Sequence, residues 1–185
     1  MNTNYFTQKK TTSDKIPGSY FILVSRLVAY KHTDIVVEAC ARLGLPLVVI
    51  GSGYEKSRLK KLAGNTITFI DSVSDGELLS WLQGCKAFLF AGDEDFGISV
   101  VEAQACGKPV IAYRNSAVKE IVIDGKTGIL FNEQTVECMM DALNRFNTQW
   151  YDSTLCRENA KRFSIDLFKS EMKKYIETIY NGRHI

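Results

Sequence analysis

The chain has 185 residues, enough for one domain with a substantial core. Its net charge of +2 is too small, and its basic residues too dispersed, for a nucleic-acid-binding protein. The five cysteines form no CxxC or Cys/His cluster, which argues against zinc and favours free thiols in a reducing cytosol. No apolar run approaches the ~18 residues that cross a bilayer. We therefore expect a cytoplasmic protein, with peripheral contact at the inner face of a membrane left open.

Short apolar runs alternate with helical segments along most of the chain. The runs lie at 20–25, 47–50, 67–70, 87–91, 110–113 and 128–131. Helices are expected at 33–43, 54–62, 75–85, from about Ser99, at 117–122 and at 135–146. Strands that read as continuous apolar runs are typical of parallel sheets covered on both faces. The pattern predicts an α/β fold: a Rossmann-like, doubly wound parallel sheet of about six strands.

Local signals mark several helix ends. Thr33 is a plausible N-cap of the first helix, and Gly44 ends it. Ser74 or Asp75, with Glu77 following, predicts a capping box at the third helix.

Three regions divide the chain. Residues 1–17 have little periodicity and read as a linker or tail. Residues 18–150 form the sheet domain. Residues 151–185 carry two basic amphipathic helices that break near 163–164.

The segment 87–113 is the centre of the functional interpretation. It reads as strand, acidic loop, glycine, helix and strand, and in such units ligands bind where the strand ends. Gly97 lets the backbone approach a ligand closely. The amides of Ile98, Ser99 and Val100 then form a helix N-terminus suited to phosphate. Glu94 and Glu102 are placed to accept hydrogen bonds from sugar hydroxyls on either side of that phosphate.

Two cations precede the first helix. Arg26 and Lys31 lie in the loop after the first strand, which can open on the same edge as residues 92–98. Together they could clamp a diphosphate. The alternative is a pair of solvated loop charges.

Other interpretations of these motifs are weaker. Gly51 and Gly53 follow a strand, but Lys56 occupies the last glycine position of a G-x-G-x-x-G fingerprint, so NAD is not expected. The two glycines still fit a tight turn on the ligand edge. Glu94 and Glu102 could instead be a glycosidase acid and nucleophile, but one short loop-and-helix segment places them poorly on opposite sides of a bond.

The central segment also resembles a known family. Glu94-Asp95-Phe96-Gly97, then Glu102, then 105–112 (ACGKPVIA) is similar to the Glu-x7-Glu signature of family 4 glycosyltransferases. Further similar segments are 25–27 (SRL) with Lys31, 49–53 (VIGSG), 69–78 (FIDSVSDGEL), 124–131 (DGKTGILF) and 158–164 (ENAKRFS). The resemblance implies the carboxy-terminal, donor-binding half of a GT-B enzyme, with 18–150 binding a nucleotide sugar.

The resemblance also implies roles for single residues. Arg26 and Lys31 would hold the donor diphosphate, and Glu94 would contact hydroxyls of the donor sugar. Catalysis would then rest on these three residues, without metal or other cofactor. Glu102 would bind the ribose, and the backbone around Val73 would meet the nucleobase. Residues from Phe96 through Gly97 and Ile98 to Ser99 would lie along sugar and phosphate.

The sequences of residues 24–39 and 94–103 resemble those of bacterial mannosyltransferases that build polysaccharide or O-antigen from GDP-mannose. A growing glycan or lipid-linked glycan would then be the acceptor. One departure is Asn115-Ser116, followed by Ala117 and Glu120, where the family usually has a glycine pair before a helix-borne glutamate. This could change the shape of the donor or acceptor site.

Residues 2–7 (NTNYFT) resemble an interdomain linker, so an amino-terminal acceptor domain would precede Met1 and the helices of 151–185 would pack back towards it. We expect the chain by itself not to catalyse transfer. Two alternatives stay open: a stand-alone nucleotide-sugar binding or regulatory module, and, less favoured, half of a phosphorylase that uses pyridoxal phosphate.

Overall fold

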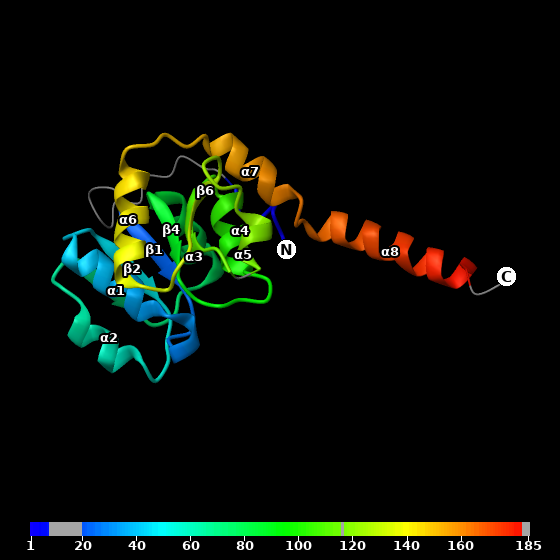
Figure 1. Ribbon diagram of the computed structural model, residues 1–185. Helices are drawn as coiled ribbons and strands as arrows, with labels where there is room; N and C mark the ends of the chain where they lie inside the picture. Colours follow the sequence, from blue (N-terminus) through cyan, green and yellow to red (C-terminus); the bar gives the residue numbers. More distant parts are fainter. Residues whose placement is uncertain (8–19, 116, 183–185) are drawn as a thin grey trace.

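The computed structural model describes residues 1–7, 20–115 and 117–182. Six parallel strands form one sheet in the order β3-β2-β1-β4-β5-β6 in this part of the chain (Figure 1). The strands are β1 (Phe21–Val24), β2 (Leu47–Ile50), β3 (Ile67–Ile70), β4 (Ala87–Phe90), β5 (Val110–Tyr113) and β6 (Gly128–Phe131). The order reverses between β1 and β4, as in doubly wound nucleotide-binding folds. The predicted fold class is confirmed.

Helices cover both faces of the sheet (Figure 1). One face carries α1 (Thr33–Arg42), α2 (Lys56–Leu62) and α6 (Val136–Asn147). The other carries α3 (Asp75–Gly84), α4 (Ile98–Ala105), α5 (Val118–Ile121) and α7 (Ser153–Lys161). A short 3-10 turn, η1 (Ala29–Lys31), and the long α8 (Ile165–Gly182) complete the elements described. This two-sided cover explains why β1, β2, β4, β5 and β6 are apolar throughout, whereas the edge strand β3 is partly exposed.

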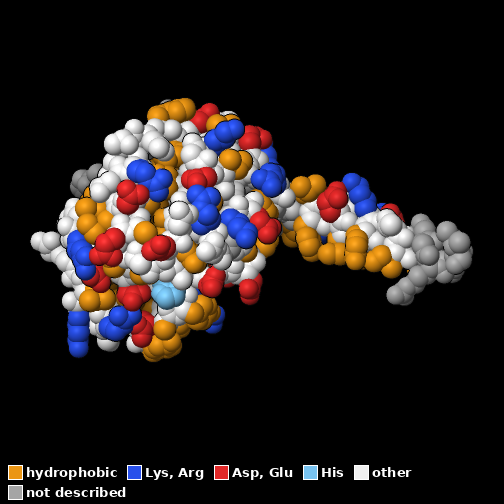
Figure 2. All heavy atoms as spheres, viewed as in Figure 1, with side chains coloured by type: hydrophobic (Ala, Val, Ile, Leu, Met, Phe, Trp, Pro, Cys, Tyr) orange, Lys and Arg blue, Asp and Glu red, His pale blue; other side chains and the backbone are white. Residues whose placement is uncertain are grey.

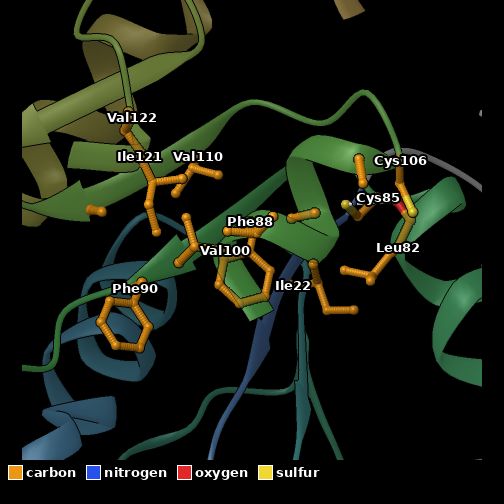
Figure 3. Close-up of a cluster of buried hydrophobic side chains, with 14 of the residues drawn as sticks. Ile22, Leu82, Cys85, Phe88, Phe90, Val100, Cys106, Val110, Ile121 and Val122 are labelled. Atoms are coloured by element: carbon orange, nitrogen blue, oxygen red, sulfur yellow. Dashed lines mark hydrogen bonds between the residues drawn. The ribbon is translucent and has the colours of Figure 1, made fainter. Parts of the chain in front are cut away.

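The core beneath α4 fixes the central unit. Val100 of α4 lies beside Phe88 of β4, and Ile121 of α5 approaches the same cluster from the next crossover (Figure 3). All three side chains are fully or almost fully buried. The helix that begins after Gly97 is therefore held on the sheet by apolar packing along most of its length.

A buried polar network joins α4 to α7. Asn159 donates to the Gln104 side-chain carbonyl (2.6 Å) and to the Ile121 carbonyl (2.5 Å). Gln104 in turn donates to the Thr127 hydroxyl (3.0 Å). Because buried polar groups are costly when unpaired, these bonds specify where α7 docks.

The predicted helix ends are confirmed in two cases and wrong in a third. The capping box at α3 is confirmed: the Ser74 hydroxyl accepts from the Glu77 amide, and the Glu77 carboxylate accepts from the Ser74 amide. Gly44 has the positive φ (63°) expected of a helix-ending glycine. Thr33 as N-cap is wrong. The capping position is His32, in a left-handed conformation, because η1 runs directly into α1.

The second helix begins two residues later than predicted. Tyr54 is committed elsewhere, since its hydroxyl accepts from the Ala29 amide (3.1 Å). The Glu55 amide likewise donates to the Leu27 carbonyl (3.1 Å). These bonds tie the chain to the loop after β1 and delay the helix to Lys56.

The ends of the chain behave differently from each other. Residues 1–7 rest on the body, with Phe6 buried and its carbonyl accepting from Arg157 (3.1 Å), whereas 8–17 of the predicted linker lie outside the described residues. Helix α8 projects away from the domain (Figure 1). Hydrophobic side chains gather along one side of it (Figure 2): Ile165, Phe168, Met172, Tyr175, Ile176 and Ile179 are all exposed. Within the described residues, no helix is both long and apolar enough to cross a membrane.

Candidate functional site

A pocket of about 600 Å³ opens at the carboxyl ends of β1 and β4. This is the edge at which doubly wound sheets bind ligands. Side chains come from the loop after β1, from the acidic loop after β4 and from the loop after β5. The lining residues are Arg26, Tyr30, Lys31, Asp93, Glu94, Asp95, Asn115 and Ala117.

Lys31 and Glu94, both in the lining of this pocket, form an ion pair. The Lys31 side chain is only 8% exposed, and that of Glu94 is 30% exposed. The ammonium also donates to the Asp93 carbonyl (3.4 Å) and lies over the ring of Tyr30, 4.8 Å from its centroid. A buried lysine needs such partners, because an unpaired charge in this position would be strongly disfavoured.

Two backbone approaches bring these loops together. A Cβ on Gly92 would come within 2.8 Å of both the Cα and the carbonyl oxygen of Lys31, so only glycine lets the loops touch. The Asp93 amide also donates to the Tyr30 carbonyl, and the Ala117 amide to the Glu94 carbonyl (3.1 Å). Gly92 and Tyr30 were not singled out from the sequence, whereas Asn115, named there as a departure from the family pattern, does line the pocket, and its neighbour Ser116 lies outside the described residues. The position of Gly92 at the end of a predicted strand was a signal that could have identified it. No sequence signal pointed to Tyr30.

Arg26 is the exposed cation of the pocket. Its guanidinium donates to the Tyr30 hydroxyl (2.5 Å), and Tyr30 is itself half exposed. The structure therefore brings Arg26, Lys31 and Glu94 together, as the sequence predicted. The remaining guanidinium N–H groups can reach anionic oxygens that enter the pocket.

The other predicted site residues lie outside the lining of this pocket. A Cβ on Gly51 would lie 1.8 Å from the Ser25 carbonyl oxygen, and one on Gly53 would lie 2.1 Å from that of Leu27. Close packing therefore accounts for both glycines, because the absence of a side chain lets the end of β2 approach the loop after β1. Val73 is partly buried against the core.

The segment at the start of α4 corrects one prediction, that of three free amides. Gly97 has a left-handed backbone (φ 86°) and caps the helix. The Val100 amide is not free, because it donates to the Gly97 carbonyl (3.0 Å). Ser99 is half-buried and Ile98 exposed, and their amides are the ones at the positive end of α4. Phe96 is exposed and meets Phe163 edge to face (6.1 Å).

Glu102 stands apart from Glu94, four residues into α4. Burial raises the pKa of this carboxyl to about 7, and the negative charge of Asp75 adds to the effect. A carboxyl with such a pKa changes its charge near neutral pH. Its capacity to accept hydrogen bonds is therefore pH-dependent.

The fold defines a Rossmann-like α/β domain, and its pocket lies at the switch point of the sheet, where such domains bind ligands. Residues 7–163 match the family described as glycosyl transferases group 1, and the chain belongs to that family. All eleven predicted site residues lie in the matched region, whereas α8 lies outside it.

Relatives and solved structures agree with this assignment. An uncharacterized glycosyltransferase of Methanocaldococcus jannaschii is 27% identical over 175 residues, covering 85% of this chain and 45% of the relative. The crystal structure of the C-terminal domain of a Francisella tularensis group 1 glycosyltransferase (LpcC) is 25% identical, with a TM-score of 0.71, 89% of this chain covered and 99% of that one. Anabaena HepE, solved with UDP and glucose, is 20% identical and has the same fold (TM-score 0.79; 96% and 55% covered). The chain spans less than half the length of the curated relatives that it matches first.

Proposed function

We propose that this chain is the nucleotide-sugar donor-binding domain of a retaining glycosyltransferase of the hexosyltransferase class. The proposal extends to mannose transfer from GDP-mannose to a growing polysaccharide or lipid-linked glycan. One observation carries it: in a group 1 glycosyltransferase chain, Arg26, Lys31 and Glu94 converge on one pocket at the carboxyl edge of the sheet. The pocket volume falls within the range of about 300–1,000 Å³ that is typical of small-molecule sites.

The pocket charges suit a diphosphate joined to a sugar. Arg26 is free to pair with phosphate oxygens, and Lys31 can exchange its Glu94 partner for a phosphate oxygen. Glu94, once released, becomes an acceptor for hydroxyl groups of the donor sugar. The phosphate and the sugar would thus replace the ion pair with two charge-assisted interactions.

The same groups can support the transfer step. The bond between the anomeric carbon and the diphosphate oxygen breaks, the acceptor oxygen bonds that carbon, and the acceptor proton leaves with the diphosphate. Negative charge grows on the departing oxygens, and Arg26, Lys31 and the amides that open α4 stabilise it. In this proposal the protein's own cations do this work and no metal or other cofactor is required.

The whole enzyme would include an acceptor-binding domain before this one. Helix α8 presents a row of exposed apolar side chains at intervals of three or four residues, as a helix does when that face packs against a partner. We assign this face to contact with the acceptor domain, with peripheral membrane contact of the full enzyme left to the acceptor's location. The isolated chain is then expected to bind donor without transferring sugar.

A calorimetric comparison of GDP-mannose, UDP-glucose and ADP-glucose tests the proposal. The nucleotide sugar that binds best should lose affinity in Arg26→Ala by about 1–3 kcal/mol, the scale of a charged hydrogen bond. Arg42→Ala is the matched control, because Arg42 ends α1 on the opposite edge of the sheet and pairs with Glu38 and Glu137. GDP-mannose as the best ligand supports the donor assignment. Equal affinities in wild type and Arg26→Ala would place the donor elsewhere, and sugar transfer by the purified chain would contradict the need for an acceptor domain.

A further inference from the structure

A second pocket, of about 270 Å³, opens on the opposite edge of the sheet. Lys86 directly precedes β4, and Lys108 lies two residues before the start of β5, so both lie where these parallel strands begin. The outer wall comes from the loop that joins α6 to α7 and contains Trp150. The height of the sheet separates this pocket from the residues of the proposed donor site.

The wall of this pocket is aromatic and already ordered. Tyr151 stacks on Phe146, with ring centroids 5.0 Å apart and an interplanar angle of 11°. The Tyr151 hydroxyl donates to the Gln149 side-chain carbonyl (2.5 Å), which leaves the Gln149 amide NH₂ as a donor. Trp150 is 82% exposed, an unusual state for so large an apolar side chain. The loop thus presents the exposed ring of Trp150 next to the stacked ring of Tyr151.

The charged side chains that line this pocket are all positive. Lys86 and Lys108 line it, and no Asp or Glu is among its described lining residues. The Lys86 ammonium donates to a neutral amide oxygen, on Asn147 at 2.6 Å, and lies over the rings of Phe21 and Phe146, so none of these partners carries a negative charge. The donor pocket, by contrast, contains three carboxylates beside its two cations. An anion entering the second pocket would meet two positive charges and no lining carboxylate.

We propose that this pocket binds a single sugar unit that carries an anionic group, either a phosphate or a carboxylate. Aromatic faces pack against the C–H surfaces of a sugar ring, while the lysines and the Gln149 amide reach its charged and hydroxyl groups. The volume lies just below the range of about 300–1,000 Å³ for drug-sized ligands, so one sugar fits better than a nucleotide sugar. The pocket would hold a charged saccharide at a distance from the proposed donor site.

Fluorine NMR of 5-fluorotryptophan-labelled protein tests this directly. The chain has two tryptophans, and the other one, Trp81 of α3, packs edge to face on Tyr20. Trp150→Phe assigns the two resonances. Titration with glucose 6-phosphate or glucuronate should shift only the Trp150 resonance, and the tighter of the two identifies the anionic group. Neutral glucose should bind at least ten-fold more weakly.

Variants separate this pocket from the donor site. Lys108→Gln should weaken binding of the better anionic sugar about ten-fold, with an unchanged Trp81 resonance as the check on folding. Lys119→Gln, an exposed lysine in α5, which follows the carboxyl end of β5 on the other edge of the sheet, should have no effect. Arg26→Ala should also leave this binding intact, so the result does not depend on the donor proposal. The proposal is overturned if neither anionic sugar shifts Trp150, if glucose binds equally well, or if Arg26→Ala rather than Lys108→Gln abolishes the shift.

Discussion

The ammonium of Lys31 pairs with the carboxylate of Glu94, although 63 residues separate them in the chain. β1 and β4 are neighbours in the sheet, so the loops that follow them leave from the same edge. The pair joins the two halves of the sheet at the point where the strand order reverses. Donor binding and local stability should therefore both depend on it.

The two partners should not contribute equally to stability. Glu94→Gln leaves the Lys31 charge buried without a counter-ion and should lower the free energy of unfolding by about 1–3 kcal/mol. Lys31→Met leaves Glu94 with access to water and should cost less than about 1 kcal/mol. Urea unfolding of both variants measures the difference. A larger loss in Lys31→Met would mean that the lysine is stabilised mainly by contacts other than Glu94.

Glu102 should make stability fall as the pH rises towards neutrality. Its pKa is raised from 4.5 to about 7 by burial and by Asp75, so between these values the folded state holds the extra proton. The free energy of unfolding then decreases with increasing pH across that window, by about 1–3 kcal/mol for a partly exposed group. Glu102→Gln should flatten the profile between pH 4.5 and 7, as followed by urea unfolding at several pH values. An unchanged slope in this variant would show that another group titrates there.

The same carboxyl should make donor affinity pH-dependent. If Glu102 accepts a sugar hydroxyl in its ionised form, the affinity for the best nucleotide sugar should rise from pH 6 to pH 8 and level off above the pKa. Asp75→Asn should move the midpoint to lower pH, because it removes a charge that raises the pKa of Glu102. Calorimetry across this range checks both effects. A midpoint that Asp75→Asn leaves in place would exclude Glu102 as the titrating group.

Gly92 should be required for the contact between the two ligand-edge loops. A methyl group in Gly92→Ala would meet the Lys31 backbone at 2.8 Å, so one loop must move. We expect a loss of about 1–3 kcal/mol in the free energy of unfolding, as for overpacked sites, together with weaker donor binding. Gly64→Ala is the control, since its methyl group would meet only the Ala41 Cβ, at 3.9 Å. Thermal unfolding and calorimetry compare the two, and equal effects would remove the steric explanation.

The two carboxy-terminal helices should differ in their importance for folding. Every described side chain from Ile165 to Tyr180 is exposed, so a chain that ends at Ile165 should unfold within about 1 kcal/mol of the full chain. A chain that ends at Asp152 loses α7, including Asn159 and its bonds to Gln104 and the Ile121 carbonyl. It should be destabilised by several kcal/mol, on the scale of unsatisfied buried polar groups plus lost apolar burial. Strong destabilisation by the shorter deletion would show that α8 packs on this domain in solution.

Sequence patterns predicted the sheet well because local chemistry determines it. β2, β3, β5 and β6 have the predicted limits, since each is a short, mostly apolar run of the kind found in parallel sheets, although the edge strand β3 is only partly buried. The Ser74–Glu77 capping box and Gly44 were also predictable, because such signals act over three or four residues. The predicted starts of α1 at an N-cap Thr33 and of α2 at Tyr54 were wrong for the complementary reason. Hydrogen bonds around η1 and Leu27, between segments far apart in the chain, decided where those two helices begin.

The residues Arg26, Lys31 and Glu94 could be chosen from the sequence by their type and by their position after apolar strands. Their meeting in one pocket, the requirement for Gly92 and the separation of Glu102 and Phe96 from that pocket depend on the packing of loops far apart in the chain. The order of residues thus determined the elements and the chemical groups available, because hydrophobic periodicity and capping act locally. Only the folded sheet decided which groups share a site, since contact between distant loops depends on strand order and on close backbone approach.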